Sequence, residues 1–187
     1  MHPILRDVPF EFETERLVIR GPIPGDGEEM QAAIAESIAE LRPWMPWAVQ
    51  VPTVEESEIR LRQKHLEFLA RKDLQLLLFL KGSHTLVGSS GLHRIDWDVP
   101  KFEIGYWIRT SFAGKGYITE AVNGIAAFAF QQLGAKRVEI RCDAKNARSA
   151  AVAQRLSFVH EATLRHEAVD HNTGELRDTM IFAKIVA

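Results

Sequence analysis

One stretch constrains the fold of this chain more than any other. Between Lys101 and Asp143, a strand-like run, a glycine-rich turn, a helical pattern and a second strand-like run follow one another. Apolar residues recur at helical spacing from Ile118 to Leu133, which predicts a helix with one buried face. Two strands joined through such a helix pair in parallel by a right-handed crossover. The chain must therefore contain a sheet with a parallel pair at this point.

The remaining periodicity predicts five further strands and three further helices. The strands are expected at 16–22, 74–80, 84–95, 158–167 and 176–184, and the helices at 25–41, 54–72 and 146–156. Thr53 and Glu56 have the spacing of a capping box at the start of one helix. Since the early strands follow one another through short turns, we expect them to pair antiparallel. The fold class is α/β (α+β), with a mixed, mostly antiparallel, seven-stranded sheet and helices on both of its faces.

The composition is that of an ordinary globular domain, and a single domain is expected over residues 1–187. Of the 187 residues, 46% are hydrophobic and 26% are charged. A formal net charge of −2 gives no electrostatic case for nucleic acid binding, which usually shows as a basic stripe or face. No apolar run approaches the roughly 18 residues that cross a bilayer, so no membrane partner is expected. The first residues lack a secretory pattern and the only cysteine is Cys142, which together favour a cytoplasmic location.

The turn at Gly114, Lys115 and Gly116 stands where the crossover helix begins. The first amides of a helix have no partner inside it, and with the helix dipole they attract an anion. Lys115 adds a positive charge, and the two glycines allow a ligand to approach closely. A phosphate or pyrophosphate is the natural ligand, and a turn without a ligand is the alternative. The spacing fits neither a Walker A motif nor G-x-G-x-x-G.

This turn resembles the acyl-CoA pyrophosphate loop of the GNAT N-acetyltransferases, which is written [QR]-x-x-G-x-[GA]. The six positions here read Ala113-Gly114-Lys115-Gly116-Tyr117-Ile118, so the first and last depart from the pattern while the backbone amides remain. The text "GKGYITEA" is similar to the RimJ/RimL branch of that family. Further segments resemble the same branch in order along the chain: "FETERLVIR" at 12–20, "LRPWMPWA" at 41–48, "FEIGYWI" at 102–108, "NARSAAVAQRLSF" at 146–158 and "LRD" at 176–178.

The resemblance implies that acetyl-CoA is the cosubstrate. It also implies a splay between strands 4 and 5 of the sheet, the two parallel strands, in which the pantetheine arm lies. Main-chain groups of Trp107, Ile108 and Arg109 are expected to pair with that arm like an added strand. The loop 113–118 is expected to hold the pyrophosphate. Asn146 is expected to cap the short helix and also to contact the arm, with capping alone as the alternative.

The resemblance further indicates how the reaction is catalysed. The attacking amine must lose a proton, and Glu103 is the first candidate for the base because burial of a carboxyl group raises its pKa. An ion pair with a neighbouring Arg or Lys is the alternative. The branch carries a serine on the short helix, here Ser149, whose hydroxyl would donate to the coenzyme A sulfur. The alternative is a serine satisfied by its own helix backbone. The tyrosine that many GNAT enzymes use as an acid is replaced by Ala153.

Aromatic residues are the candidates for the acceptor site. Trp44 and Trp47 lie in a proline-stiffened segment and are expected to wall the entrance, with a core plug as the alternative. Tyr106 is a further candidate. Because Tyr106 and Trp107 lie on opposite faces of one strand, at most one of them points at the cleft.

Other residues that could carry chemistry are interpreted as structural. His166, Asp170 and His171 lack metal-ligand spacing and indicate a solvated turn, so no metal is expected. Cys142 lies in a strand pattern and is expected to be a small core residue rather than a nucleophile.

These features predict an N-acetyltransferase of the EC 2.3.1 type, which transfers the acetyl group of acetyl-CoA to a primary amine by direct attack in a ternary complex. The RimJ/RimL resemblance suggests a protein N-terminal α-amine, as on a ribosomal protein. One alternative acceptor is a small amine such as a polyamine, an amino acid or an aminoglycoside. A non-catalytic acyl-CoA sensor is another alternative, because the usual Gln/Arg and tyrosine are missing. Paired subunits are frequent in such enzymes, so a homodimer is one expectation.

Overall fold

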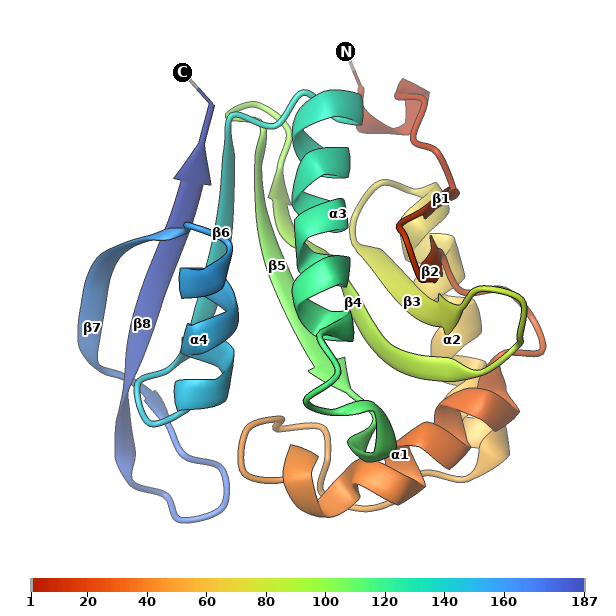
Figure 1. The fold of residues 1–187 in the computed structure, drawn as a ribbon, viewed down its shortest axis with the longest axis horizontal. Coiled ribbons are helices and arrows are strands. Elements are labelled where there is room, and N and C mark those ends of the chain that lie inside the picture. The colour runs from red at the N-terminus through yellow and green to blue at the C-terminus, as the bar shows by residue number, and fades with distance from the viewer. Residues whose placement is uncertain (1, 187) are drawn as a thin grey trace.

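A computed structural model describes residues 2–186, and Figure 1 shows its fold. The strands are β1 (Glu11–Glu13), β2 (Leu17–Arg20), β3 (Leu74–Leu80), β4 (Leu86–Asp96), β5 (Lys101–Ile108), β6 (Arg137–Asp143), β7 (Val159–Val169) and β8 (Leu176–Ile185). The helices are α1 (Gly27–Leu41), α2 (Val54–Leu69), α3 (Tyr117–Gln132) and α4 (Ala147–Arg155), with 3-10 turns η1 (Pro3–Leu5) and η2 (Thr110–Phe112). The capping box of α2 forms as expected, since Thr53 Oγ1 accepts from Glu56 N at 3.1 Å and Glu56 Oε2 accepts from Thr53 N at 2.7 Å.

The strands form one mixed sheet in the order β1-β2-β3-β4-β5-β6-β8-β7. Every neighbouring pair is antiparallel except β5 and β6, which are parallel and joined through α3, as the crossover pattern predicts. The expected count of seven strands was wrong, because the sheet formed within residues 2–186 has eight. The strand that the sequence did not reveal is β1, which has only three residues, two of them glutamates, and so shows no clear apolar alternation.

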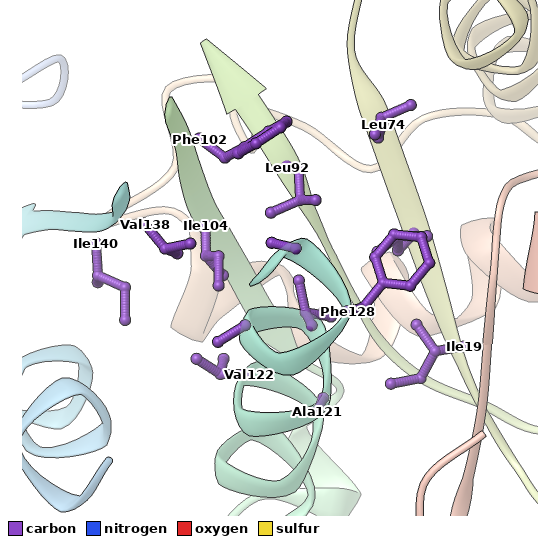
Figure 2. Packing of buried hydrophobic residues seen from close by; sticks show 14 of the residues in the cluster. Ile19, Leu74, Leu92, Phe102, Ile104, Ala121, Val122, Phe128, Val138 and Ile140 are labelled. Atoms are coloured by element: carbon purple, nitrogen blue, oxygen red, sulfur yellow. The ribbon is translucent and has the colours of Figure 1, made fainter. Parts of the chain in front are cut away.

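Helices cover both faces of the sheet, as expected. One core cluster joins α3 and α4 to one face, and a second joins α1 and Leu61 of α2 to the other. Phe68, near the end of α2, belongs to the first cluster. Figure 2 shows Val122 and Phe128 of α3 among Ile19, Ile104 and neighbouring strand residues of the first cluster. Strand β3 is buried on both sides, which explains why its sequence "LQLLLFL" is apolar at every position except Gln75.

The two parallel strands diverge soon after they meet. Strand β5 pairs with β6 only where Lys101–Glu103 face Arg137–Glu139. Beyond that point β5 stays paired with β4 as far as Ile108, and β6 stays paired with β8 as far as Asp143. Strands β5 and β6 thus stay paired with β4 and β8 but no longer with each other. Figure 1 shows β5 and β6 separating. This is the expected splay between the fourth and fifth predicted strands. Over residues 2–186, none of the helices combines the length and apolarity needed to span a bilayer.

Candidate active site

The glycine-rich loop has the backbone of an anion site. Gly114 and Gly116 have φ values of 76° and 83°, in the left-handed region that favours glycine. Gly116 is the N-cap of α3, and the first backbone bond of the helix runs from Glu120 N to the Gly116 carbonyl at 3.0 Å. The amides of the first turn before Glu120 therefore remain for a ligand. Lys115 lies exposed on the loop and adds positive charge.

A carboxylate fixes this loop to the start of the sheet. Glu120 Oε1 accepts from Thr14 Oγ1 at 2.6 Å and from Arg16 N at 2.7 Å, and Oε2 accepts from Arg16 Nε at 2.6 Å. Although burial acts to raise it, these bonds hold the pKa of Glu120 below its usual value. Arg16 also donates through Nη1 to the Lys115 carbonyl at 3.0 Å, and its guanidinium lies 4.3 Å from the centre of the Tyr117 ring.

Sequence reasoning missed the part that Arg16 plays in this loop. Its guanidinium stands beside the loop whose first position, Ala113, lacks the family's Gln or Arg. Both ends of the network lie in segments that carry the family resemblance, "TERL" at 14–17 and "TEA" at 119–121. The presence of both segments in one sequence was the available signal for a contact between Arg16 and the loop. Only the folded chain brings the two segments together.

The main chain at the end of β5 differs in part from the expectation. The Arg109 amide donates to the Val87 carbonyl of β4 at 2.8 Å, so it is already occupied. Main-chain groups alternate along an antiparallel pair, so Trp107 also faces β4 while Tyr106 and Ile108 face the splay. Of the three residues expected to pair with the pantetheine, only Ile108 therefore offers its main chain to the opening, and Tyr106 joins it.

The side chain of Arg109 holds the entrance to the loop against α1. Its Nε donates to Glu36 Oε2 at 2.6 Å, and Ser111 N donates to Glu36 Oε1 at 2.7 Å. Thr110 N donates to Ser37 Oγ at 3.0 Å. Hydrogen bonds from Ser111 and Arg109 lower the pKa of Glu36 to about 2. Helix α1 thus positions η2 and the loop that follows it.

Across the splay, α4 presents Ser149. Asn146 caps this helix, since its Oδ1 accepts from Ser149 N at 3.1 Å, as expected. The Ser149 hydroxyl is not confined to its own helix, because Tyr106 places its phenol 3.0 Å from Ser149 Oγ and 3.0 Å from the Ser149 carbonyl. Cys142 is buried nearby on β6, and burial raises the pKa of its thiol. This environment favours the expected core role over that of a nucleophile.

A cleft lies between the sheet and the pair α1 and α2, with a volume of about 440 Å³. Its apolar lining includes Met30, Ile34, Met45, Trp47, Leu61 and Trp107, and its polar lining includes Arg60, Lys64, Gln75, Ser89, Ser90 and His93. Gly105 and Tyr106 of β5 also reach it, so the cleft touches the strand that borders the splay. The rings of Trp47 and Trp107 stand 6.0 Å apart, and the Arg60 guanidinium lies 5.1 Å from the Trp47 ring.

Two expected residues stand outside this lining. Over residues 2–186 the lining includes Trp47 but not Trp44, which is half-buried on the same loop. Glu103 is also not part of it. Burial raises the pKa of Glu103, as a base requires, while Arg94 Nε lies 3.5 Å from its Oε2 and acts in the opposite direction. Glu103 therefore has features of both expected roles, buried base and ion-pair partner.

Of the polar residues near the last hairpin, Asp170 and His171 lie in the connection between β7 and β8, and His166 lies within β7. Asp170 Oδ1 accepts from Asn172 N at 2.8 Å and from Thr173 N at 3.1 Å. His171 Nε2 lies 2.8 Å from the Arg42 carbonyl at the end of α1. His166 and His171 are exposed, and Asp170 is half-buried.

A splay beside a helix-terminal anion site is the arrangement of an acyl-CoA-dependent transferase, and comparison with known proteins agrees. The sequence model of the acetyltransferase (GNAT) domain matches residues 16–159, and the chain therefore belongs to the GNAT acetyltransferase family. It is an acetyl-CoA-dependent N-acetyltransferase related to the RimL/RimJ-like ribosomal-protein N-acetyltransferases. Of the two alternatives left open by the sequence, membership of this family supports an enzyme rather than a non-catalytic acyl-CoA sensor.

Individual proteins are similar to this chain in sequence or in fold. YdaF of Bacillus subtilis (strain 168), named as a ribosomal N-acetyltransferase, is 31% identical over 152 residues, which cover 81% of this chain and 82% of YdaF. The microcin C7 self-immunity acetyltransferase MccE, solved with acetyl-CoA and AMP, superposes with a TM-score of 0.84 at 25% identity, covering 92% of this chain and 93% of that one. RimL, the ribosomal L7/L12 α-N-protein acetyltransferase solved with coenzyme A, gives a TM-score of 0.85 at 21% identity, covering 96% and 97%.

Proposed function

We propose that this enzyme acetylates the α-amine of a protein N-terminus, as on a ribosomal protein, by direct attack of the amine on acetyl-CoA in a ternary complex. The observation that carries the proposal is the place of the cleft. It lies under α1 and α2 and reaches Gly105 and Tyr106, whereas Ser149 and the glycine-rich loop belong to the elements of the other face. Cosubstrate and acceptor can therefore enter from opposite faces and meet at the splay.

The cosubstrate is held mainly by backbone groups. The diphosphate binds the first amides of α3 over loop 113–118, with Lys115 and Arg16 supplying positive charge. The pantetheine arm pairs with the free edge of β5 at Tyr106 and Ile108, and Asn146 contacts it from the start of α4. This path leads the thioester toward Gly105.

Transfer forms a bond between the amine nitrogen and the carbonyl carbon of the thioester and breaks the carbon–sulfur bond. Ser149 Oγ donates a hydrogen bond to the departing thiolate, and Tyr106 supports that hydroxyl from 3.0 Å. The amine must lose a proton before it attacks, and Glu103, whose pKa is raised by burial, is one proposed acceptor of that proton, directly or through water. An α-amine needs less help than a lysine, because the ordinary pKa of an α-amine is about 7.7–8.0 and that of a lysine side chain is about 10.4.

The relatives support a peptide acceptor, since YdaF is named for ribosomal N-acetylation and RimL for ribosomal L7/L12. A cleft of about 440 Å³ with two tryptophans holds the first residues of a chain. The test is a thiol-release screen with acetyl-CoA against N-terminal peptides and, in parallel, polyamines, amino acids and aminoglycosides. We expect turnover of peptides and none of the same peptides with a blocked α-amine. If no peptide releases thiol from acetyl-CoA while a small amine is rapidly acetylated, the acceptor is a small molecule.

A further inference from the structure

A histidine and an aspartate form a hydrogen-bonded dyad at the floor of the acceptor cleft. His93 of β4 lines the cleft, and its Nδ1 lies 2.7 Å from Oδ2 of Asp73, which immediately precedes β3. Although burial acts to raise it, the bond and charge of His93 and the charge of Lys64 hold the pKa of Asp73 below its usual value. An ionised carboxylate only accepts hydrogen bonds, so the ring hydrogen belongs on Nδ1. Nε2 then carries the lone pair.

Two glycines make room for the imidazole. A methyl group added at Gly91 would lie 2.7 Å from Cε1 and 2.9 Å from Nε2 of His93. A methyl group added at Gly105 would lie 3.2 Å from Cδ2 and 3.4 Å from Nε2. The ring edge formed by Cε1, Nε2 and Cδ2 therefore lies close to the backbone of Gly91 and Gly105, and no larger residue fits at Gly91 without displacing the ring. Within residues 2–186, Nε2 makes no hydrogen bond to the protein.

The position of Gly105 shows that the His93 ring lies near the place where the thioester is proposed to bind. Glu103 is the last residue of β5 that pairs with β6, so Gly105 borders the splay in which the thioester is placed. Side chains of directly opposed residues share one face of a sheet. His93 is the partner of Glu103 across β4 and β5, and both lie on the cleft side, but His93 alone of the two lines the cleft.

We infer that His93 is a catalytic base for the acceptor amine and that Asp73 positions it. The inference rests on the proposed function. The α-ammonium group gives one proton to Nε2 of His93, which acts here in place of Glu103, and the free amine then attacks the thioester. The new nitrogen–carbon bond forms, the thiolate leaves with the electron pair of the carbon–sulfur bond, and the second proton of the nitrogen passes to that thiolate. Asp73 fixes the reactive tautomer and stabilises the imidazolium that results, in the manner of a histidine held by a carboxylate in other enzymes.

Charged groups surround the ring from every element packed against it. On one side stand Asp73 and Lys64, whose Nζ lies 3.5 Å from Asp73 Oδ1. Across the strand stands Glu103 with Arg94. From α2, Glu56 and Arg60 line the same cleft. Since Asp73 Oδ1 has no hydrogen-bond partner among the described residues, the bond to His93 is the main polar contact of that carboxylate.

The test compares the full-length enzyme with H93Q, D73N and E103Q, using the best acceptor from the thiol-release screen. Gln keeps a polar group that can bond Asp73 but cannot accept a proton. H84Q is the matched control, because His84 is an exposed histidine in the turn between β3 and β4. We measure kcat/KM from pH 6 to 9, coenzyme A affinity by calorimetry and thermal melting. We expect H93Q to lose about 10²-fold in kcat/KM at pH 7 with coenzyme A affinity unchanged.

The pH profile separates catalysis from structure. The H93Q defect should shrink toward pH 9, because the α-amine then loses its proton without help. D73N should also lower kcat/KM with coenzyme A affinity unchanged, because the imidazole loses the ionised partner that orients it. Three outcomes would overturn the role of His93 and leave the proposed function intact. They are an H93Q defect that is the same at every pH, a defect found only in E103Q, and an H93Q kcat/KM within twofold of the parent. A parent enzyme that acetylates no amine would overturn the proposed function, and this role with it.

Discussion

The phenol of Tyr106 on β5 and the hydroxyl of Ser149 on α4 stand 3.0 Å apart, and this contact bridges the splay. Helix α4 follows β6, so the pair joins the two strands that separate from one another. Burial raises the pKa of Tyr106 to about 12, against the hydrogen bond with Ser149, so the phenol keeps its proton at neutral pH. The single phenol hydrogen is donated to the Ser149 carbonyl at 3.0 Å, so in this state the Ser149 hydroxyl can donate to the Tyr106 oxygen. Rotation of the serine hydroxyl would redirect its hydrogen to a sulfur atom in the opening.

Removal of these hydroxyls should slow acetyl transfer without weakening cofactor binding. We expect S149A to lower kcat about 10²-fold, the scale of a lost proton donor. Y106F should lower kcat less, because Ser149 remains, and should reduce the free energy of unfolding by about 1 kcal/mol for one lost hydrogen bond. Steady-state kinetics, calorimetry with coenzyme A and denaturant unfolding measure the three quantities. Loss of coenzyme A binding with kcat unchanged would assign Ser149 to the binding site instead.

The parts of this site that could be predicted are those whose residues lie close together in the sequence. The loop 113–118 and α3 are continuous in sequence, so glycine placement and helical periodicity were enough to predict them. The bond between His93 and Asp73 joins residues 20 positions apart, and only the β3–β4 register brings them together. The alternation in "GLHRI" placed Gly91 and His93 on one face, which was the only available hint. The count of strands failed at β1, where pairing to β2 overrides a weak local pattern.

The glycine at the anion site can be tested against a matched glycine elsewhere. Gly114 and Gly134 have φ values of 76° and 70°, and an added methyl group at either position meets nothing within 4 Å. Alanine should therefore cost each position a similar amount, about 1 kcal/mol, for the left-handed backbone. Only G114A should also weaken coenzyme A binding, because the phosphates approach that backbone. Equal coenzyme A affinity in the two variants, measured by calorimetry, would place the diphosphate elsewhere.

The lowered pKa of Glu36 predicts that part of the free energy of unfolding depends on pH. Its pKa is lowered from 4.5 to about 2 in the folded chain by hydrogen bonds from Ser111 and Arg109. A lowered folded pKa stabilises the protein above the unfolded value, and this stability is lost as pH falls from about 4.5 to about 2. The difference in unfolding free energy between the parent and E36Q should therefore shrink over that range. E28Q is the control, because Glu28 is exposed on the same helix and no hydrogen bond of its side chain is found within residues 2–186. Denaturant melts at a series of pH values measure both differences, and a parent–E36Q difference that does not change with pH would contradict the prediction.

The two tryptophans of the α1–α2 loop should differ in their effect on the acceptor. Trp47 lines the cleft and packs against Trp107, whereas Trp44 does not belong to the described lining. Because an apolar contact in a substrate pocket contributes about 1–3 kcal/mol, W47A should raise the acceptor KM about tenfold or more. W44A should leave that KM within about twofold, and neither variant should change coenzyme A affinity, since the loop lies on the face opposite α3. Thermal melting of both variants shows whether each remains folded, and equal KM effects would mean that the acceptor does not contact Trp47.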